Sequence, residues 1–293
     1  MIARALGNTG IFVSALGLGA GHIGGDDLTD EDAERLLDRV LDLGVTLIDT
    51  ARSYGRSEER IARVLARRRD DVILSTKGGY GLQGVEDWTF EAIRRGIDEA
   101  LSRLRTDRID VFHLHSCPIE TLRHGEVIDA LDDAKRAGKI RVAAYSGENE
   151  ALDFAIDSGR FGAVQCSVNV CDQRALDGAV PRAHERGVGV IGKRPIANAP
   201  WRFDQRPRGD YAETYWTRLA AMDLDVPREE WPDVALRFSA HAPCVSSVIV
   251  GTKRLEHLEA DVAILEKGAL SPEMAARLRD AFRAHDDGWR GEI

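Results

Sequence analysis

The stretch Gly44-Val45-Thr46-Leu47-Ile48-Asp49-Thr50-Ala51-Arg52-Ser53-Tyr54 joins an apolar run of strand length to a polar loop. Such a run, bounded by glycine and polar residues, is typical of a buried strand in a parallel sheet. The segment before it, after Asp30, places five apolar residues on one stripe of a helix: Ala33, Leu36, Leu37, Val40 and Leu41. A helix followed by a buried strand is the repeating unit of α/β proteins, so the stretch indicates that class.

The same alternation runs through most of the chain. Strand-length apolar runs occur at Ser14–Gly19, Val45–Asp49, Val72–Lys77, Ile109–His115, Ile140–Ser146, Ala163–Asn169, Gly189–Lys193 and Ser247–Gly251. Eight such runs separated by helix-period segments favour a closed (β/α)8 barrel over an open sheet. Because one barrel with insertions accounts for 293 residues, we expect residues 1–293 to form a single TIM-barrel domain.

Two segments fall outside this alternation. Leu6–Ile11 reads as a turn between two short strands, which predicts an N-terminal β-hairpin ahead of the barrel. Pro195–Pro232 is long and rich in Pro, Arg, Asp and Trp. It predicts a long loop after strand seven, with a helix near Ala212–Met222.

The overall composition excludes several classes of partner. Forty Lys and Arg against 49 Asp and Glu give a net charge of −9, which repels nucleic acid and anionic lipid. No apolar run approaches the roughly 20 residues of a membrane-spanning helix, and the first residues do not resemble a signal peptide. The four cysteines lack metal-binding spacing. We therefore expect a cytoplasmic protein without a metal, a membrane anchor or a nucleic-acid partner.

Polar residues with useful chemistry follow most of the expected strands. In a barrel of this kind the active site forms at the carboxyl ends of the strands. Five strands end in such a residue, and a tyrosine follows the second strand; the set is Asp49, Lys77, His115, Ser146, Lys193 and Tyr54. A polar residue at the end of one strand carries little information, because loops begin there. Six such residues together indicate an active site.

Four of these residues make sense as one proton-donating unit. Tyr54 is a weak acid unless a cation stabilises its phenolate, and Lys77 supplies a cation that Asp49 would keep charged. His115 would hydrogen-bond a substrate oxygen or relay a proton. Each residue alone has an ordinary structural explanation, such as a cap, a solvated strand end or packing, so the prediction depends on the set.

These segments resemble the aldo-keto reductase superfamily. The similarity rests on Gly44 through Glu58, Ser75-Thr76-Lys77, Asp110 through His115, and the opening Leu6 through Ser14. It implies an NAD(P)H-dependent carbonyl reductase, by default monomeric, in which Asp49, Tyr54, Lys77 and His115 form the catalytic tetrad. His113 competes with His115 for one place, and the family spacing from Asp110 selects His115.

A second motif points to another class of dehydrogenase. Gly19-Ala20-Gly21-His22-Ile23-Gly24 matches the dinucleotide fingerprint of Rossmann folds, and Asp49 follows at the next strand end. That fingerprint needs a helix to open at the glycines, whereas Gly25 through Thr29 precede the helical period. We expect instead a flexible loop over the barrel mouth.

The cofactor residues are predicted from the later strands and from the resemblance. Lys253 and Arg254 lie next to a predicted helix start after strand eight, and together with Gly251 and Thr252 they predict a phosphate site. The resemblance extends this site to His257 and Asp261. His257 and Asp261 replace the commoner arginine and asparagine. The resemblance also implies that Ser146 and Gln165 hold the nicotinamide carboxamide, with Gly147 in place of the usual asparagine. Lys193 and Arg194 stand where many relatives have an aromatic residue, and either meet the cofactor or lie at a solvated rim. NADPH is expected rather than NADH.

The substrate cannot be identified beyond a small-molecule carbonyl compound. Aromatic and histidine side chains in the loops are expected to roof the pocket: His22, Trp88 and Trp201, with Tyr211 and Trp216 in the same segments. An NADPH-binding regulatory or sensor barrel resembling potassium-channel β-subunits is the alternative function. A cofactor-independent isomerase or lyase using the Lys, Asp and His is a third.

Overall fold

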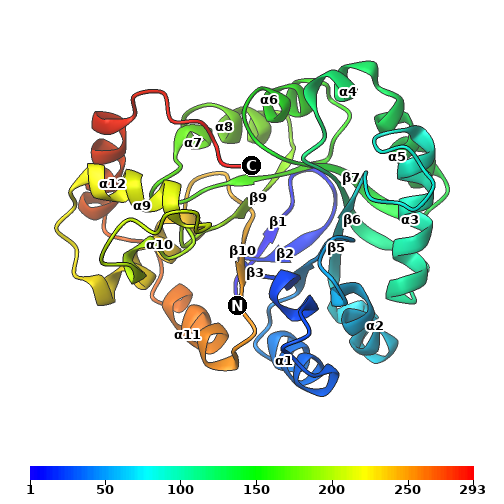
Figure 1. Ribbon diagram of the computed structural model, residues 1–293, viewed down its shortest axis with the longest axis horizontal. Helices are drawn as coiled ribbons and strands as arrows, with labels where there is room; N and C mark the ends of the chain where they lie inside the picture. Colours follow the sequence, from blue (N-terminus) through cyan, green and yellow to red (C-terminus); the bar gives the residue numbers. More distant parts are fainter.

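The computed structural model describes residues 1–293 and consists of a barrel surrounded by helices (Figure 1). Eight parallel strands close in the order β10-β3-β4-β5-β6-β7-β8-β9. Their bounds are β3 Leu16–Gly19, β4 Leu47–Asp49, β5 Ile73–Gly78, β6 Ile109–His115, β7 Ile140–Ser146, β8 Ala163–Ser167, β9 Gly189–Lys193 and β10 Ser247–Gly251. Each predicted run overlaps one of these strands, so the predicted (β/α)8 barrel is confirmed.

The helices form a ring around the strands (Figure 1). They are α1 Asp30–Asp42, α2 Ser57–Arg68, α3 Phe90–Leu104, α4 Ile119–His124, α5 Glu126–Arg136, α6 Asn149–Asp157, α7 Arg174–Asp177, α8 Ala179–Glu185, α9 Glu213–Met222, α10 Trp231–Ala240, α11 Leu255–Glu266 and α12 Pro272–His285. Helix α1 shows why they form. The hydroxyl of Thr29 accepts a hydrogen bond from the backbone N–H of Asp32, and the predicted apolar stripe is buried. No helix is long and apolar enough to cross a membrane.

The predicted hairpin closes the amino-terminal end of the barrel. Strands β1 Ala3–Ala5 and β2 Phe12–Ser14 pair antiparallel. Leu6, Ile11 and Val13 are buried in one cluster with inward-facing barrel residues such as Leu47 and Val111. The interior of the barrel is therefore sealed by apolar packing at that end, and polar side chains gather at the other.

The long segment after β9 has more structure than the sequence predicts. Helix α9 lies where a helix is expected, but α10 begins at Trp231, inside the predicted loop. Helix α12 is a further element that the sequence pattern does not identify. These helices share a second apolar cluster that includes Tyr215, Trp231, Phe238 and Leu278. After α12 the chain returns to the middle of the ring (Figure 1), which brings its last residues to the barrel mouth.

Candidate active site

Lys77 and Asp49 form a buried ion pair at the ends of neighbouring strands. Nζ of Lys77 lies 2.5 Å from Oδ2 of Asp49 and donates a second hydrogen bond to the carbonyl of Thr50 at 2.9 Å. The other oxygen of Asp49 accepts from the hydroxyl of Ser75 at 2.7 Å and the amide of Gln165 at 3.1 Å. Burial acts to raise the pKa of Asp49, but the charge of Lys77 and the hydrogen bonds from Lys77 and Ser75 leave it below its usual value. The pair is therefore ionised.

Tyr54 follows β4 in a tight turn, closed by a 3.0 Å hydrogen bond from its N–H to the carbonyl of Ala51. Its ring centroid lies 5.2 Å from Nζ of Lys77. Lys77 lowers the pKa of Tyr54 as expected, but burial and the charge of Asp49 together outweigh it and leave this pKa above its usual value. The phenol is consequently neutral near pH 7, the form that donates a proton.

The two histidines of β6 occupy different environments. His115 lines the active-site cavity, and its ring centroid lies 6.0 Å from that of Tyr54 in an edge-on arrangement. Burial, and secondly the charge of Lys77, lower the pKa of His115 to about 3. His113 is completely buried, with Nε2 3.1 Å from the hydroxyl of Ser75, and does not line the cavity. The structure thus places His115, and not His113, where a substrate can reach it.

A cavity of about 710 Å³ opens at the carboxyl ends of the strands. Three residues of the predicted tetrad line it, namely Asp49, Tyr54 and His115, while Lys77 lies behind Asp49 and Tyr54. The cavity is also lined by other residues predicted to bind the cofactor or the substrate: His22, Ser146, Gln165, Lys193, Arg194, Tyr211 and Gly251. The polar strand ends of the sequence therefore do meet at one site.

Three predicted pocket residues lie elsewhere. Trp216 does not line the cavity, and its indole N–H donates to the carbonyl of Phe203 at 3.1 Å. Trp88 does not line the cavity and packs against Tyr80, with ring centroids 5.6 Å apart. Trp201 stacks on Trp231 at 5.8 Å with nearly parallel rings, and so belongs to the α9–α12 cluster. Large aromatic side chains bury most area against neighbouring apolar groups, and here that packing keeps the indoles of Trp88 and Trp201 out of the cavity wall. Tyr80 lines the cavity in their place.

Ser146 and Gln165 form a polar pair in the cavity wall. The hydroxyl of Ser146 donates to the side-chain oxygen of Gln165 at 3.1 Å. The next residue, Gly147, has no room for a side chain, because a Cβ there would overlap the hydroxyl of Tyr145. That hydroxyl donates to the carbonyl of Cys117 at 3.2 Å. A side chain at position 147 would therefore displace the hydroxyl of Tyr145.

Lys193 is an inward-facing residue, and not a cation of a solvated rim. Its ammonium lies 3.1 Å from a carboxylate oxygen of Glu148, and only 14% of its side chain is exposed. Glu148 also accepts a hydrogen bond from the N–H of Ser167 at 2.7 Å. Arg194 lines the same wall and donates to the carbonyl of Glu292 at 2.5 Å. The sequence carries no signal for the Glu148 partnership.

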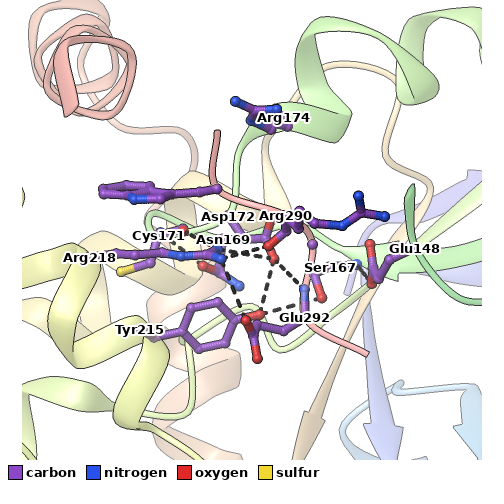
Figure 2. A network of polar contacts seen from close by, with 12 residues as sticks. Glu148, Ser167, Asn169, Cys171, Asp172, Arg174, Tyr215, Arg218, Arg290 and Glu292 are labelled. Atoms are coloured by element: carbon purple, nitrogen blue, oxygen red, sulfur yellow. Dashed lines mark hydrogen bonds and ion pairs between the residues drawn. The ribbon is translucent and has the colours of Figure 1, made fainter. Parts of the chain in front are cut away.

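The last residues of the chain are bound to the barrel by a polar network (Figure 2). Arg218 donates to the carbonyl of Arg290 at 2.6 Å, and the N–H of Glu292 donates to Asp172 at 3.3 Å. Tyr215 donates to the same carboxylate at 3.2 Å. Burial raises the pKa of Asp172 to about 7. This segment becomes part of the cavity mouth although nothing in its sequence predicts that position.

The predicted phosphate site at the start of α11 is only partly free. Lys253, which follows β10, is paired with Asp27, which follows the neighbouring strand β3, and Arg254 lies 3.6 Å from Glu256. Thr252 caps Arg254 locally, with its hydroxyl accepting from that residue's N–H at 3.0 Å. No side chain caps the first turn of α11. Two further predicted residues lie on this helix, the exposed His257 and the partly buried Asp261.

The glycine motif after β3 serves packing. Ala20–Gly24 is a 3₁₀ helix, and not the flexible loop that the sequence suggests, while α1 begins only at Asp30. A Cβ on Gly24 would overlap the backbone oxygen of Tyr54. The glycine therefore allows this turn to lie directly against the Tyr54 loop, and the helix start that a Rossmann fingerprint requires is absent.

Known proteins resemble this chain in sequence and in fold. The sequence profile of the Aldo/keto reductase family matches residues 15–283. L-Galactose dehydrogenase of Arabidopsis thaliana is 31% identical over 278 residues, covering 89% of this chain and 86% of that protein. NADH-specific methylglyoxal reductase of Escherichia coli is 25% identical, covering 92% and 89% respectively. A solved aldo-keto reductase of Bacillus halodurans, in its holo form, superposes with a TM-score of 0.81 at 27% identity over 96% of each chain. The chain belongs to the aldo/keto reductase family.

Proposed function

We propose that this chain is an NAD(P)H-dependent oxidoreductase that reduces an aldehyde or ketone, or oxidises the corresponding alcohol or sugar lactol, with Tyr54 as general acid and base. One observation carries the proposal. A neutral tyrosine lies in the wall of an open cavity with its ring 5.2 Å from a buried, ionised lysine. Within this family, that arrangement matches proton transfer to a substrate oxygen.

The chain's own residues divide the work. A bound reduced nicotinamide would supply the hydride for the carbonyl carbon. The hydroxyl of Tyr54 protonates the carbonyl oxygen, and the charge of Lys77 stabilises the phenolate that remains. Asp49 keeps Lys77 protonated within the buried pair. Neutral His115 hydrogen-bonds the same oxygen and orients it toward Tyr54.

The residues present fit a nicotinamide dinucleotide. Ser146 and Gln165 offer a hydroxyl and an amide in the cavity wall, which suit the donor and acceptor atoms of a carboxamide. The uncapped first turn of α11 offers backbone N–H groups to phosphate, flanked by Lys253 and Arg254. We infer a preference for NADPH from these two cations, reduced in strength because Lys253 also binds Asp27.

The substrate class follows from the cavity wall and from relatives. Polar side chains share the cavity wall with Tyr54, including Ser53, Ser116 and Asn198. L-Galactose dehydrogenase, one of the relatives, is named for a sugar. A hydroxylated aldehyde or a sugar lactol suits such a wall better than a purely apolar carbonyl compound, because its hydroxyl groups keep hydrogen bonds after leaving water.

Absorbance of the reduced nicotinamide tests the proposal directly. The purified chain is mixed with NADPH or NADH and a panel of hydroxylated and aryl aldehydes, and in reverse with oxidised cofactor and sugar lactols. We expect turnover that depends on both cofactor and carbonyl compound. Tight cofactor binding with no turnover on any member of a broad panel would instead support the sensor function.

A further inference from the structure

Tyr80, which the sequence does not single out, touches the predicted catalytic histidine. Its hydroxyl oxygen lies 3.1 Å from Nδ1 of His115, and the two rings are 5.7 Å apart with an interplanar angle of 30°. Tyr80 follows β5 and His115 ends β6, so the contact joins adjacent strand ends at the cavity. The hydroxyl of Tyr80 makes no other hydrogen bond within the protein.

The identity of the protonated nitrogen matters because His115 is neutral. Burial, and then the charge of Lys77, hold the pKa of His115 at about 3, so its imidazole carries one N–H. Nε2 makes no hydrogen bond within the protein and is not among the buried unpaired atoms. Since His115 lines the cavity, Nε2 is the nitrogen available to a ligand there.

The chemistry of the contact selects one tautomer. A phenol donates a hydrogen bond far more readily than it accepts one, whereas an unprotonated imidazole nitrogen is a good acceptor. Donation from Tyr80 to Nδ1 leaves the proton on Nε2. An Nε2–H donates to a carbonyl oxygen; the other tautomer would point a lone pair at that oxygen and repel it.

Packing and hydrogen bonds hold the loop that carries Tyr80 in place. Trp88 packs against the Tyr80 ring at 5.6 Å and donates its backbone N–H to the carbonyl of Gly79 at 2.8 Å. The N–H of Gly81 donates to Asp87 at 2.8 Å. Hydrogen bonds on both sides of Tyr80, together with an aromatic neighbour, restrict where its hydroxyl lies.

We propose that Tyr80 is a positioning residue whose hydroxyl donates a hydrogen bond to Nδ1 of His115 and thereby holds the neutral imidazole as the Nε2–H tautomer facing the cavity. The consequence for turnover rests on the proposed reductase function, while the tautomer itself does not. Loss of one neutral hydrogen bond at the orienting residue should lower kcat by about five- to tenfold, with a smaller effect on KM.

The test reads the tautomer by two-bond ¹H–¹⁵N correlation in the full chain labelled with ¹⁵N-histidine, with His115 assigned from the missing signals of His115→Gln. In the wild type we expect the Nε2–H pattern. Tyr80→Phe keeps the ring and removes only the hydroxyl, and should shift His115 toward a mixture of tautomers and lower kcat. Tyr211→Phe removes another cavity hydroxyl, which contacts Arg194, and should leave the His115 pattern unchanged.

Two results would overturn the assignment. One is an Nδ1–H pattern in the wild type, a measurement that needs no substitution and therefore stands even if Tyr80→Phe folds poorly. The other is a folded Tyr80→Phe chain with the wild-type tautomer, whatever its activity. Failure of the proposed function looks different, since then no carbonyl compound is turned over while the tautomer pattern still reports on Tyr80.

Discussion

Nζ of Lys77 lies 2.5 Å from a carboxylate oxygen of Asp49, and neither side chain is more than 2% exposed. A buried ion pair recovers its desolvation cost only when the remaining hydrogen-bonding positions are filled. Ser75, Gln165 and the carbonyl of Thr50 fill them here. The result is a fixed positive charge near the Tyr54 ring.

Replacing Tyr54 with Phe removes the acid and leaves the ring. We expect kcat to fall by about 10² or more, with thermal stability and cofactor affinity near those of the wild type, because the lost hydroxyl acts only in proton transfer. Steady-state kinetics together with fluorescence titration of the cofactor measure the two effects. A fully active Tyr54→Phe chain is incompatible with the mechanism.

Lys77→Met should act through the acidity of Tyr54. Lys77 lowers the pKa of Tyr54 within a net upward shift, so removing it raises that pKa further. Reduction needs the protonated phenol, so the alkaline limb of its pH profile should move to higher pH. The rate should fall by about tenfold or more, because the phenol becomes a weaker acid.

A matched variant separates this effect from unfolding. Lys77→Met leaves Asp49 buried without its partner, at a cost of about 3–5 kcal/mol. Lys77→Met combined with Asp49→Asn removes both charges and should recover much of that stability in denaturant unfolding, without recovering the rate. If the alkaline limb of the pH–rate profile does not move in either variant, Lys77 has a structural role and does not tune the acidity of Tyr54.

Cofactor choice is expected to depend on Lys253, Arg254 and their competitor Asp27. Lys253→Ala with Arg254→Ala should weaken NADPH binding by about tenfold and leave NADH binding nearly unchanged, because only NADPH carries the extra phosphate. Asp27→Asn should strengthen NADPH binding several-fold by releasing Lys253. Titration calorimetry with each cofactor measures both changes. Equal affinity for NADPH and NADH in the wild type would show that Lys253 and Arg254 do not bind the extra phosphate of NADPH.

Asp261 should make stability fall with rising pH. Burial raises its pKa from 3.8 to about 7. Between those values the unfolded chain is ionised at this position and the folded chain is not, so folding is disfavoured progressively as the pH rises through that window. Asp261→Asn lacks this penalty and should be more stable by about 1–2 kcal/mol at alkaline pH and little changed at acidic pH. Urea unfolding of the two cofactor-free chains at an acidic and an alkaline pH checks this. A stability difference between Asp261→Asn and the wild type that is the same at both pH values would contradict it.

The positions of Asp49, Lys77 and His115 could be predicted from the sequence because each ends an apolar run, and a parallel barrel brings strand ends together. Tyr54 followed from its distance of a few residues beyond a strand. Tyr80 and Glu148 could not be predicted in the same way, since their contacts depend on how loops fold back over the barrel. The loop positions of Trp88 and Trp201 predict that both lie in the pocket, but packing against Tyr80 and Trp231 decides where they lie.

The hairpin that seals the amino end of the barrel has a consequence for the supply of protons. Apolar Leu6, Ile11 and Val13 cover that end of the barrel. Under the proposed mechanism, each proton that Tyr54 gives up must be replaced from bulk water through the mouth, the opening that the substrate also uses. Substrate entry and the reloading of Tyr54 with a proton therefore share the carboxyl side of the barrel, where the cavity opens.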